Sequence, residues 1–172
     1  MTRIVRILTS TEPPWLLRTA IERLDFEQEL DQLSADFGFL TVLLDARMMK
    51  TVYGVFKEFA NALHFPDYFG FNSAAFDECL ADLSWHTARG ICIGIVAAEE
   101  LLGDENNEIG WLLQLLEAIC KEWSVPIDDD GPWDRSPVPF HVVFQTAGGS
   151  SASLPAQLAA LPSLEQLSLS SA

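Results

Sequence analysis

Residues 65–85 read FPDYFGFNSAAFDECLADLSW, an aromatic turn followed by a short amphipathic helix. Asn72 or Ser73 suits the helix N-cap, because short polar side chains accept hydrogen bonds from the free N–H groups of a first turn. Apolar residues at helical spacing then predict a buried stripe of Phe76, Cys79, Leu80 and Leu83. Three acids lie off that stripe and are expected to face solvent: Asp77, Glu78 and Asp82. The stretch carries four acids and no Lys or Arg. This composition favours a positively charged partner, and a plain solvated helix face is the alternative.

The residues before this stretch predict a strand and a helix. Residues 39–45, FLTVLLD, form a continuous apolar run with β-branched members, which predicts a strand buried on both faces. Thr51 is the expected N-cap of a helix, which Gly54 weakens. The apolar face of that helix consists of Val52, Val55, Phe56, Phe59 and Leu63. Pro66 marks its end.

Two further strands are predicted at residues 91–97 and 140–145, with a helix from about Ile109 to Trp123 between them. Strands separated by helices need crossover connections, which place the strands in parallel and the helices on the sheet faces. The fold class is therefore α/β, and we expect a three-stranded parallel sheet flanked by helices.

The two ends of the chain read as additions to this unit. Residues 3–8 suggest a short strand, and Pro13-Pro14 a helix start. Leu17, Ala20, Ile21 and Leu24 continue at helical spacing, and the stripe of Phe26, Leu30 and Leu33 ends near Gly38. We expect a mixed, mainly helical N-terminal extension over 1–38 packed on the core, a domain over 39–146 and a low-complexity C-terminal tail over 147–172. Leu158, Leu161, Leu164 and Leu167 recur every third residue, which leaves open a docking helix or a mobile tail.

The charge of the chain limits its partners. Of its 172 residues, 25 are acids and 10 are Lys or Arg, which gives a formal net charge of −15. Phosphate backbones and anionic membranes repel such a protein, so we expect no nucleic-acid or membrane binding and favour a basic protein partner. Acidity that only aids solubility is the alternative.

The apolar runs are too short to span a bilayer, and no secretory signal pattern opens the sequence. Cys79, Cys92 and Cys120 form no CxxC motif, which is typical of reduced thiols in a cytoplasmic protein.

The stretch 65–85 resembles the signature of the barstar family, the intracellular inhibitors of secreted bacterial ribonucleases. The shared pattern is a proline, an acid, two aromatics, a glycine, a spacer, an asparagine and then a short helix with an acid before Cys-Leu. Residues 43–63, LLDARMMKTVYGVFKEFANAL, agree with the family in length and periodicity. The resemblance covers about residues 39–146 and implies a barstar-like three-stranded parallel sheet.

The resemblance also implies how the protein acts: a helix and its preceding loop cover a ribonuclease active site and place acids where substrate phosphates lie. By position, Tyr68 and Asn72 match that loop, and Glu78 matches the main inhibitory aspartate of the family. Ala74 stands where the family has an aspartate, and Asp77 stands where it has a bulky aromatic. The acids are thus rearranged to Asp77 and Glu78, with Asp82 as a further member.

Two functions follow from this resemblance. The first is an immunity protein that binds a basic toxin, expected to be of ribonuclease type, one to one in the cytoplasm. The alternative is a non-inhibitory interaction module on the same fold, which would use the acidic region 99–130 or the apolar tail.

Other chemistry has little support in the sequence. His64, His86 and His141 have no local pattern of a Cys–His hydrolase, so we expect no enzyme. A calcium loop that starts at Asp128 would need Gly at its sixth place and Glu at its twelfth, which hold Trp133 and Pro139. Glycine-rich nucleotide motifs are absent from the sequence. We therefore predict no metal and no cofactor.

Overall fold

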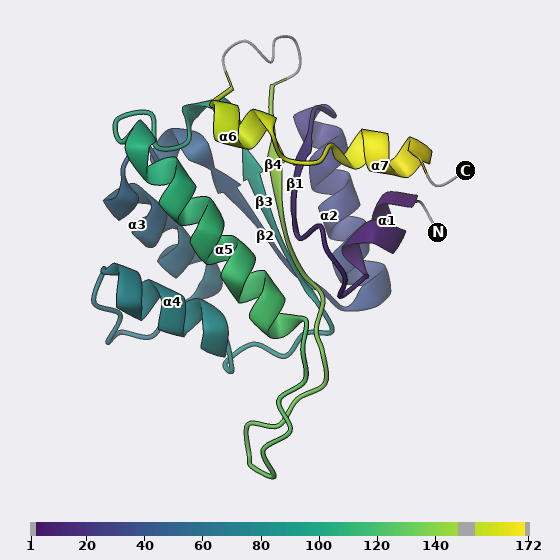
Figure 1. Cartoon of the computed structure of the whole chain (residues 1–172), viewed down its shortest axis with the longest axis vertical. Helices are drawn as coiled ribbons and strands as arrows, with labels where there is room; N and C mark the ends of the chain where they lie inside the picture. The colour runs from purple at the N-terminus through teal and green to yellow at the C-terminus, as the bar shows by residue number, and fades with distance from the viewer. Residues whose placement is uncertain (1–2, 148–153, 171–172) are drawn as a thin grey trace.

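The computed structural model describes residues 3–147 and 154–170, and its centre is a parallel sheet of four strands (Figure 1). The strands are β1 (Leu16–Thr19), β2 (Leu40–Asp45), β3 (Ile91–Val96) and β4 (Phe140–Gln145). Their order across the sheet is β1-β4-β3-β2. The α/β class and the parallel arrangement are confirmed, whereas the predicted number of three strands is wrong.

The fourth strand comes from the N-terminal segment, where the local pattern is misleading. Residues Arg3–Leu8, predicted as a strand, form the helix α1. The residues expected to begin a helix after Pro13-Pro14 instead form β1, which pairs with β4 from Leu16↔Val142 to Thr19↔Gln145. Leu24, a member of the supposed helical stripe, is 65% exposed. Pairing with a strand more than 120 residues away therefore overrides the local spacing.

Burial differs between the central strands and the edge strand. Every residue of β3 and β4 is buried, as expected for strands covered by helices on both faces. In β2 only Leu44 is buried and the other five residues are partly exposed. The expectation that this strand is buried on both faces is wrong, because β2 lies at the edge of the sheet beside β3 alone.

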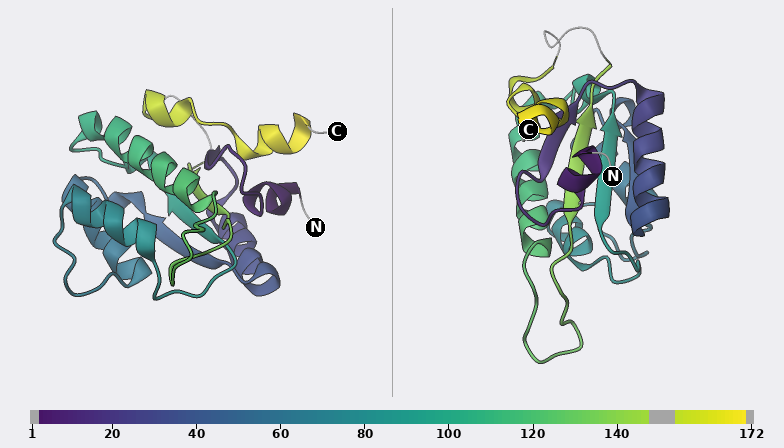
Figure 2. Two further views of the ribbon diagram at one scale, coloured as in Figure 1. Left: turned by 60° about the horizontal axis from the view of Figure 1, so that its bottom comes forward. Right: turned by 90° about the vertical axis from the view of Figure 1, so that its right-hand side faces the viewer.

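Helices cover both faces of the sheet (Figure 2). On one face lie α3 (Val52–Leu63), α4 (Ser73–Asp82), α5 (Ile109–Trp123) and α6 (Ala156–Ala159), whose buried residues share the larger core. On the other face lie α1, α2 (Arg23–Phe37) and α7 (Leu164–Ser170). Short 3₁₀ turns occupy Ala46–Met48, Ala98–Glu100 and Asn106–Glu108. In the described part of the chain, no helix is long and apolar enough to cross a membrane.

The approach of α2 to the sheet explains a glycine inside β3. A Cβ atom at Gly94 would lie 2.8 Å from Leu30 Cδ1 and from an edge atom of the Phe26 ring. Both side chains are buried and have little room to shift, so α2 packs directly on the backbone of this strand. Gly54 in α3 has a similar cause, since a Cβ there would lie 2.7 Å from the carbonyl oxygen of Met48.

The C-terminal segment covers the outer edge of β1 (Figure 2). The backbone N–H of Arg18 donates to the carbonyl of Pro162 at 3.0 Å, and Arg18 Nε donates to the carbonyl of Leu161 at 3.0 Å. Glu165 then accepts hydrogen bonds from the Thr19 hydroxyl and from the Ala20 backbone N–H. Leu158 and Leu164 are buried, so these residues dock on the core, which decides between the two alternatives for this part of the tail.

The Glu165 carboxylate should stabilise the docking of this C-terminal segment on the sheet. Burial alone would raise its pKa, but hydrogen bonds from Ser163, Thr19 and Ala20 outweigh burial and lower it, so the carboxylate is ionised at neutral pH. Glu165→Ala should lower the free energy of unfolding by about 1–3 kcal/mol, because buried donors lose their acceptor. Urea unfolding measures this loss, with the exposed Gln157→Ala on α6 as the control. An equal loss of unfolding free energy in the two variants would contradict this role of Glu165.

His141 is fully buried on β4, opposite Cys92 of β3. Neither of its ring nitrogens has a hydrogen-bond partner of good geometry among the described residues. Burial, the largest cause, lowers its pKa from 6.5 to about 4, although a backbone interaction with Leu8 opposes the change. The imidazole is therefore neutral in the folded protein at neutral pH.

This buried imidazole predicts an acid-sensitive fold. The unfolded chain binds a proton near pH 6.5 and the folded chain only near 4, so stability should fall as pH drops through this window. The loss should reach about 3 kcal/mol. Urea unfolding at a series of pH values should show a shallower decline for His141→Leu than for the parent. Gln157→Ala, at an exposed side chain of α6 that does not titrate, is the control and should keep the parental slope. An unchanged slope in His141→Leu would contradict the assignment.

Candidate partner-binding surface

The connection between α3 and α4 is held by an aromatic cluster. Thr51 caps α3 by accepting from the Gly54 N–H at 3.1 Å, and the helix ends at His64 in the left-handed conformation. Phe65 then packs edge-on against Phe69, with ring centroids 5.1 Å apart. Trp85 Nε1 donates to the carbonyl of Leu63 at 2.8 Å, which ties the segment after α4 to the end of α3. The loop is therefore braced from both sides.

Asn72 holds the beginning of α4. Its side-chain oxygen accepts from the Ala75 N–H at 3.0 Å, which confirms the predicted cap. Its side-chain nitrogen donates to the carbonyl of Gly70 at 3.3 Å. Asn72 is also predicted to bind a partner, yet both ends of its amide serve the turn in the free protein. The side chain of Asn72 remains exposed, and its role in binding a partner stays a prediction.

The buried side of α4 is as predicted. Phe76, Cys79 and Leu80 are buried, and Leu83 is a buried C-cap in the left-handed conformation. Trp123 Nε1, at the end of α5, donates to the carbonyl of Leu80 at 2.9 Å. This bond satisfies a free carbonyl in the last turn of α4 and fixes the helix on α5.

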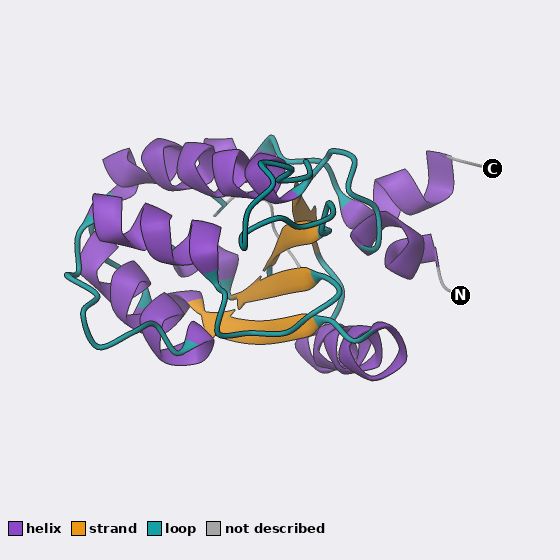
Figure 3. Cartoon of the chain, turned by 90° about the horizontal axis from the view of Figure 1, so that it is seen from below, coloured by secondary structure: helices purple, strands orange, loops and turns teal. Residues whose placement is uncertain are grey.

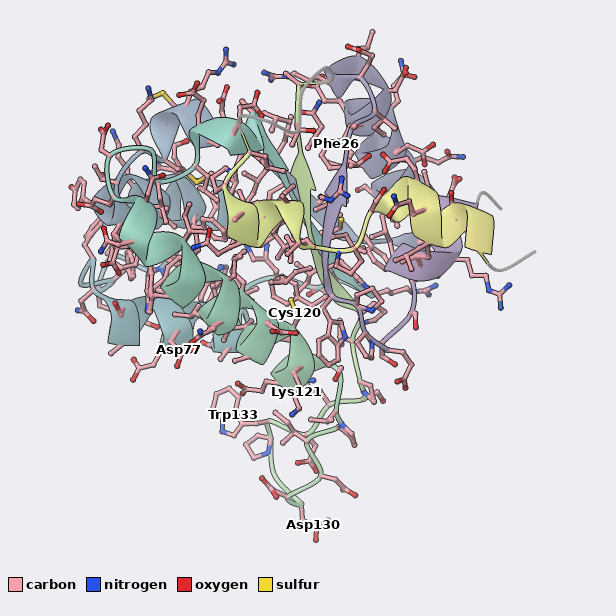
Figure 4. The ribbon with its side chains drawn as sticks, turned by 45° about the horizontal axis from the view of Figure 1, so that its top comes forward. Phe26, Asp77, Cys120, Lys121, Asp130 and Trp133 are labelled. Carbon is pink, nitrogen blue, oxygen red and sulfur yellow. The ribbon has the colours of Figure 1, made fainter. Side chains whose placement is uncertain are left out.

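The opposite side of α4 presents the predicted acids. Asp77, Glu78 and Asp82 are exposed, and Asp77 points away from the body of the molecule (Figure 4). Tyr68, in the preceding turn, is 78% exposed. Between residues 65 and 88 the sequence has no Lys or Arg, so no cation of this segment neutralises the acids. All five residues predicted to bind a partner, Asn72 included, are thus exposed on α4 and its preceding turn.

The cysteine thiols do not form a reactive centre. Burial raises the pKa of Cys79, and the carboxylates of Asp82 and Glu78 add to the increase. Burial raises the pKa of Cys92 to about 12, next to a neutral His141. A Cys–His nucleophile needs the reverse, a depressed thiol pKa and a proton-accepting histidine within hydrogen-bond reach. These thiols therefore act as packed apolar groups.

Sequence reasoning missed an aromatic pair beside the acids. Tyr53 of α3 and Phe71 of the turn are 61% and 44% exposed, and their rings stack with centroids 5.5 Å apart. Phe71 has a φ of 49°, the left-handed region that bulky residues rarely adopt. Helical periodicity could place Tyr53 on the exposed side of α3. It could not show that Phe71 lies against it, because that contact depends on the conformation of the turn.

A scan against protein-family models matches residues 39–145 to the model described as Barstar (barnase inhibitor), which is more than half of the chain. The chain belongs to the barstar family. No curated protein matches it. The matched segment runs from the residue before β2 to the end of β4, so the barstar-family part comprises three of the four strands. The strand β1 and the helices α1, α2, α6 and α7 lie outside the match.

The barstar-family segment carries a protruding loop between α5 and β4 (Figure 1). Ile127 and Arg135 bridge its two arms, and the Arg135 guanidinium lies 4.3 Å over the Trp123 ring. Arg135 also donates to three carbonyls at the end of α5, those of Glu122, Trp123 and Val125. Trp133 is 71% exposed on this loop (Figure 4).

Acidic side chains gather at the tip of this loop. Carboxylate oxygens of Asp128, Asp130 and Asp134 lie within 4.8 Å of one another, and all three residues are exposed. Asp134 also accepts from the Asp129 N–H at 3.0 Å, which makes it part of the turn. Exposed acids are common in this arrangement without a bound ion.

The cap at Asn72 predicts a stability effect that is separate from binding. Asn72→Ala should lower the free energy of unfolding by about 1 kcal/mol, because the first turn of α4 loses an acceptor. Asn72→Ser should retain most of the stability, since serine caps as well as asparagine. Thermal unfolding compares these variants with the control Ser73→Ala, one residue later. A stable Asn72→Ala would show that the cap is unimportant.

Proposed function

We propose that this barstar-family protein inhibits a basic ribonuclease of the barnase type. It would do so one to one, by covering the active site with α4 and the turn before it. The observation that carries the proposal is the exposed acidic side of α4 within a segment free of Lys and Arg. Membership of the barstar family, whose model is that of a barnase inhibitor, supports the same partner class.

The acids have a clear physical role in this proposal. A ribonuclease site binds phosphate through cationic side chains, and a carboxylate placed there forms charge-assisted hydrogen bonds in a desolvated pocket. Glu78 would make the central contact, with Asp77 and Asp82 on either side and Tyr68 at the rim. The net charge of −15 would speed the encounter with a basic enzyme in the cytoplasm, before that enzyme is released.

The contacts that hold α4 in the free protein favour such an interaction. The Asn72 cap, the aromatic cluster and the Trp123–Leu80 bond fix the helix before the partner arrives. Little ordering of this helix would then be needed on binding, which favours affinity.

A second candidate is a non-inhibitory interaction module that binds through the loop of residues 124–139. The exposed Trp133 favours it, because aromatic side chains on protruding segments often anchor protein partners. The apolar tail is a weaker surface for this alternative, since Leu158 and Leu164 are buried.

Barnase is the direct test. Its cleavage of a fluorogenic RNA should be inhibited in proportion to added protein, with an equivalence point at one to one. Barnase activity that remains unchanged at a hundredfold excess would overturn the proposal for this class of enzyme.

The acids should carry the inhibition. Glu78→Gln and Asp77→Asn should each raise the inhibition constant at least about tenfold, because a desolvated charge pair is lost. Association of the parent with barnase should also slow as salt is raised, since long-range attraction is screened. The matched control is Asp31→Asn, at an exposed acid of α2 on the opposite face of the sheet. Trp133→Ala tests the second candidate: if it alone weakens binding, the loop is the contact surface.

A further inference from the structure

Exposed aromatic side chains gather at one end of the molecule, where α3 meets α4. This end lies away from both termini (Figure 3). Tyr53, Tyr68 and Phe71 are all exposed there, and Tyr53 and Phe71 stack with an angle of 29° between their rings. None of these three rings belongs to the buried residues of either core, and a group of exposed aromatic rings is typical of an interaction site.

The backbone at Phe71 strengthens this point. Its φ of 49° is disfavoured for a side chain with a Cβ, whereas glycine would adopt it without strain. Residues held in such conformations cluster at ligand clamps and active sites. The ring of Phe71 is also held from below, with its centroid 4.8 Å from that of the buried Phe69. The chain therefore retains a strained aromatic residue and fixes its orientation.

The stacked pair lies at the beginning of α4, the helix that carries the exposed acids. Phe71 directly precedes Asn72, the N-cap of that helix. Within α4, Ala74, Glu78 and Asp82 are spaced four residues apart, so they form one row along the helix. An exposed aromatic pair at the beginning of a helix that carries exposed carboxylates is complementary to a side chain that is both flat and positively charged.

We propose that the stacked rings of Tyr53 and Phe71 receive an arginine side chain of the basic partner. A guanidinium is planar and weakly hydrated, so it stacks on an aromatic face while its N–H groups bond to carboxylates; a lysine ammonium does this less well. The same chemistry occurs within the chain, where the Arg135 guanidinium lies over the Trp123 ring. Among the described residues, no cation of the chain lies over the Tyr53 or Phe71 ring. This inference rests on the proposed function only in taking the partner to be a basic protein.

Phe71→Gly separates a binding role from a structural one. It removes the ring and also relieves the backbone strain, so the melting temperature should be unchanged or higher. The dissociation constant for barnase should nevertheless rise at least about tenfold, and Tyr53→Ala should have a similar effect. Leu24→Ala, at a 65% exposed side chain of α2, is the control and should change neither quantity. A lower melting temperature with unchanged affinity in Phe71→Gly would overturn the proposal.

Hexa-arginine and hexa-lysine peptides provide a readout that does not depend on ribonuclease inhibition. The parent should bind hexa-arginine about threefold more tightly than hexa-lysine, and Phe71→Gly should abolish this preference. If barnase is not inhibited but the preference is found, the proposed function fails. The proposal that Tyr53 and Phe71 receive an arginine side chain then stands. Equal binding of the two peptides by the parent would overturn the proposed arginine site, and so would a preference that survives Phe71→Gly.

Discussion

The buried strand β4 is the element on which the rest of the molecule depends. It pairs with β3 on one side and β1 on the other, and helices cover both of its faces. Its apolar side chains therefore contribute to both cores. The helix α5 packs on this sheet, and its last residue, Trp123, bonds to the carbonyl of Leu80. The position of α4, and with it the row of acids, thus follows from β4 through α5.

Much of this arrangement could be predicted from the sequence, because its cause is local. The apolar face of α3, the buried stripe of α4 and the helix Ile109–Trp123 follow from helical spacing. The caps at Thr51 and Asn72 follow from the chemistry of short polar side chains. The two central strands are predicted from short, mainly apolar stretches at residues 91–97 and 140–145. Each of these features involves residues within a few turns of one another.

The features that could not be predicted depend on distant contacts. Residues Leu16–Thr19 are a strand only because β4 offers them a free edge, and their own pattern favours a helix. The half-buried state of β2 likewise follows from its place at the edge of the sheet. At the candidate site, the position of Phe71 follows from a backbone angle and from the Tyr53 ring, which is 18 positions earlier. The residue type of Phe71 alone shows neither its backbone angle nor its contact with Tyr53.

The contact of the C-terminal segment with β1 has a consequence for the order of events during synthesis. Arg18 and Leu161 are 143 positions apart, so this contact joins two ends of the chain. Contacts between residues so far apart in sequence form late, because a long loop must first be closed. Residues 39–145 are translated before residue 161, so the barstar-family segment leaves the ribosome ahead of the residues that cover the outer edge of β1. Covering of that edge therefore waits until the chain has been translated past Glu165.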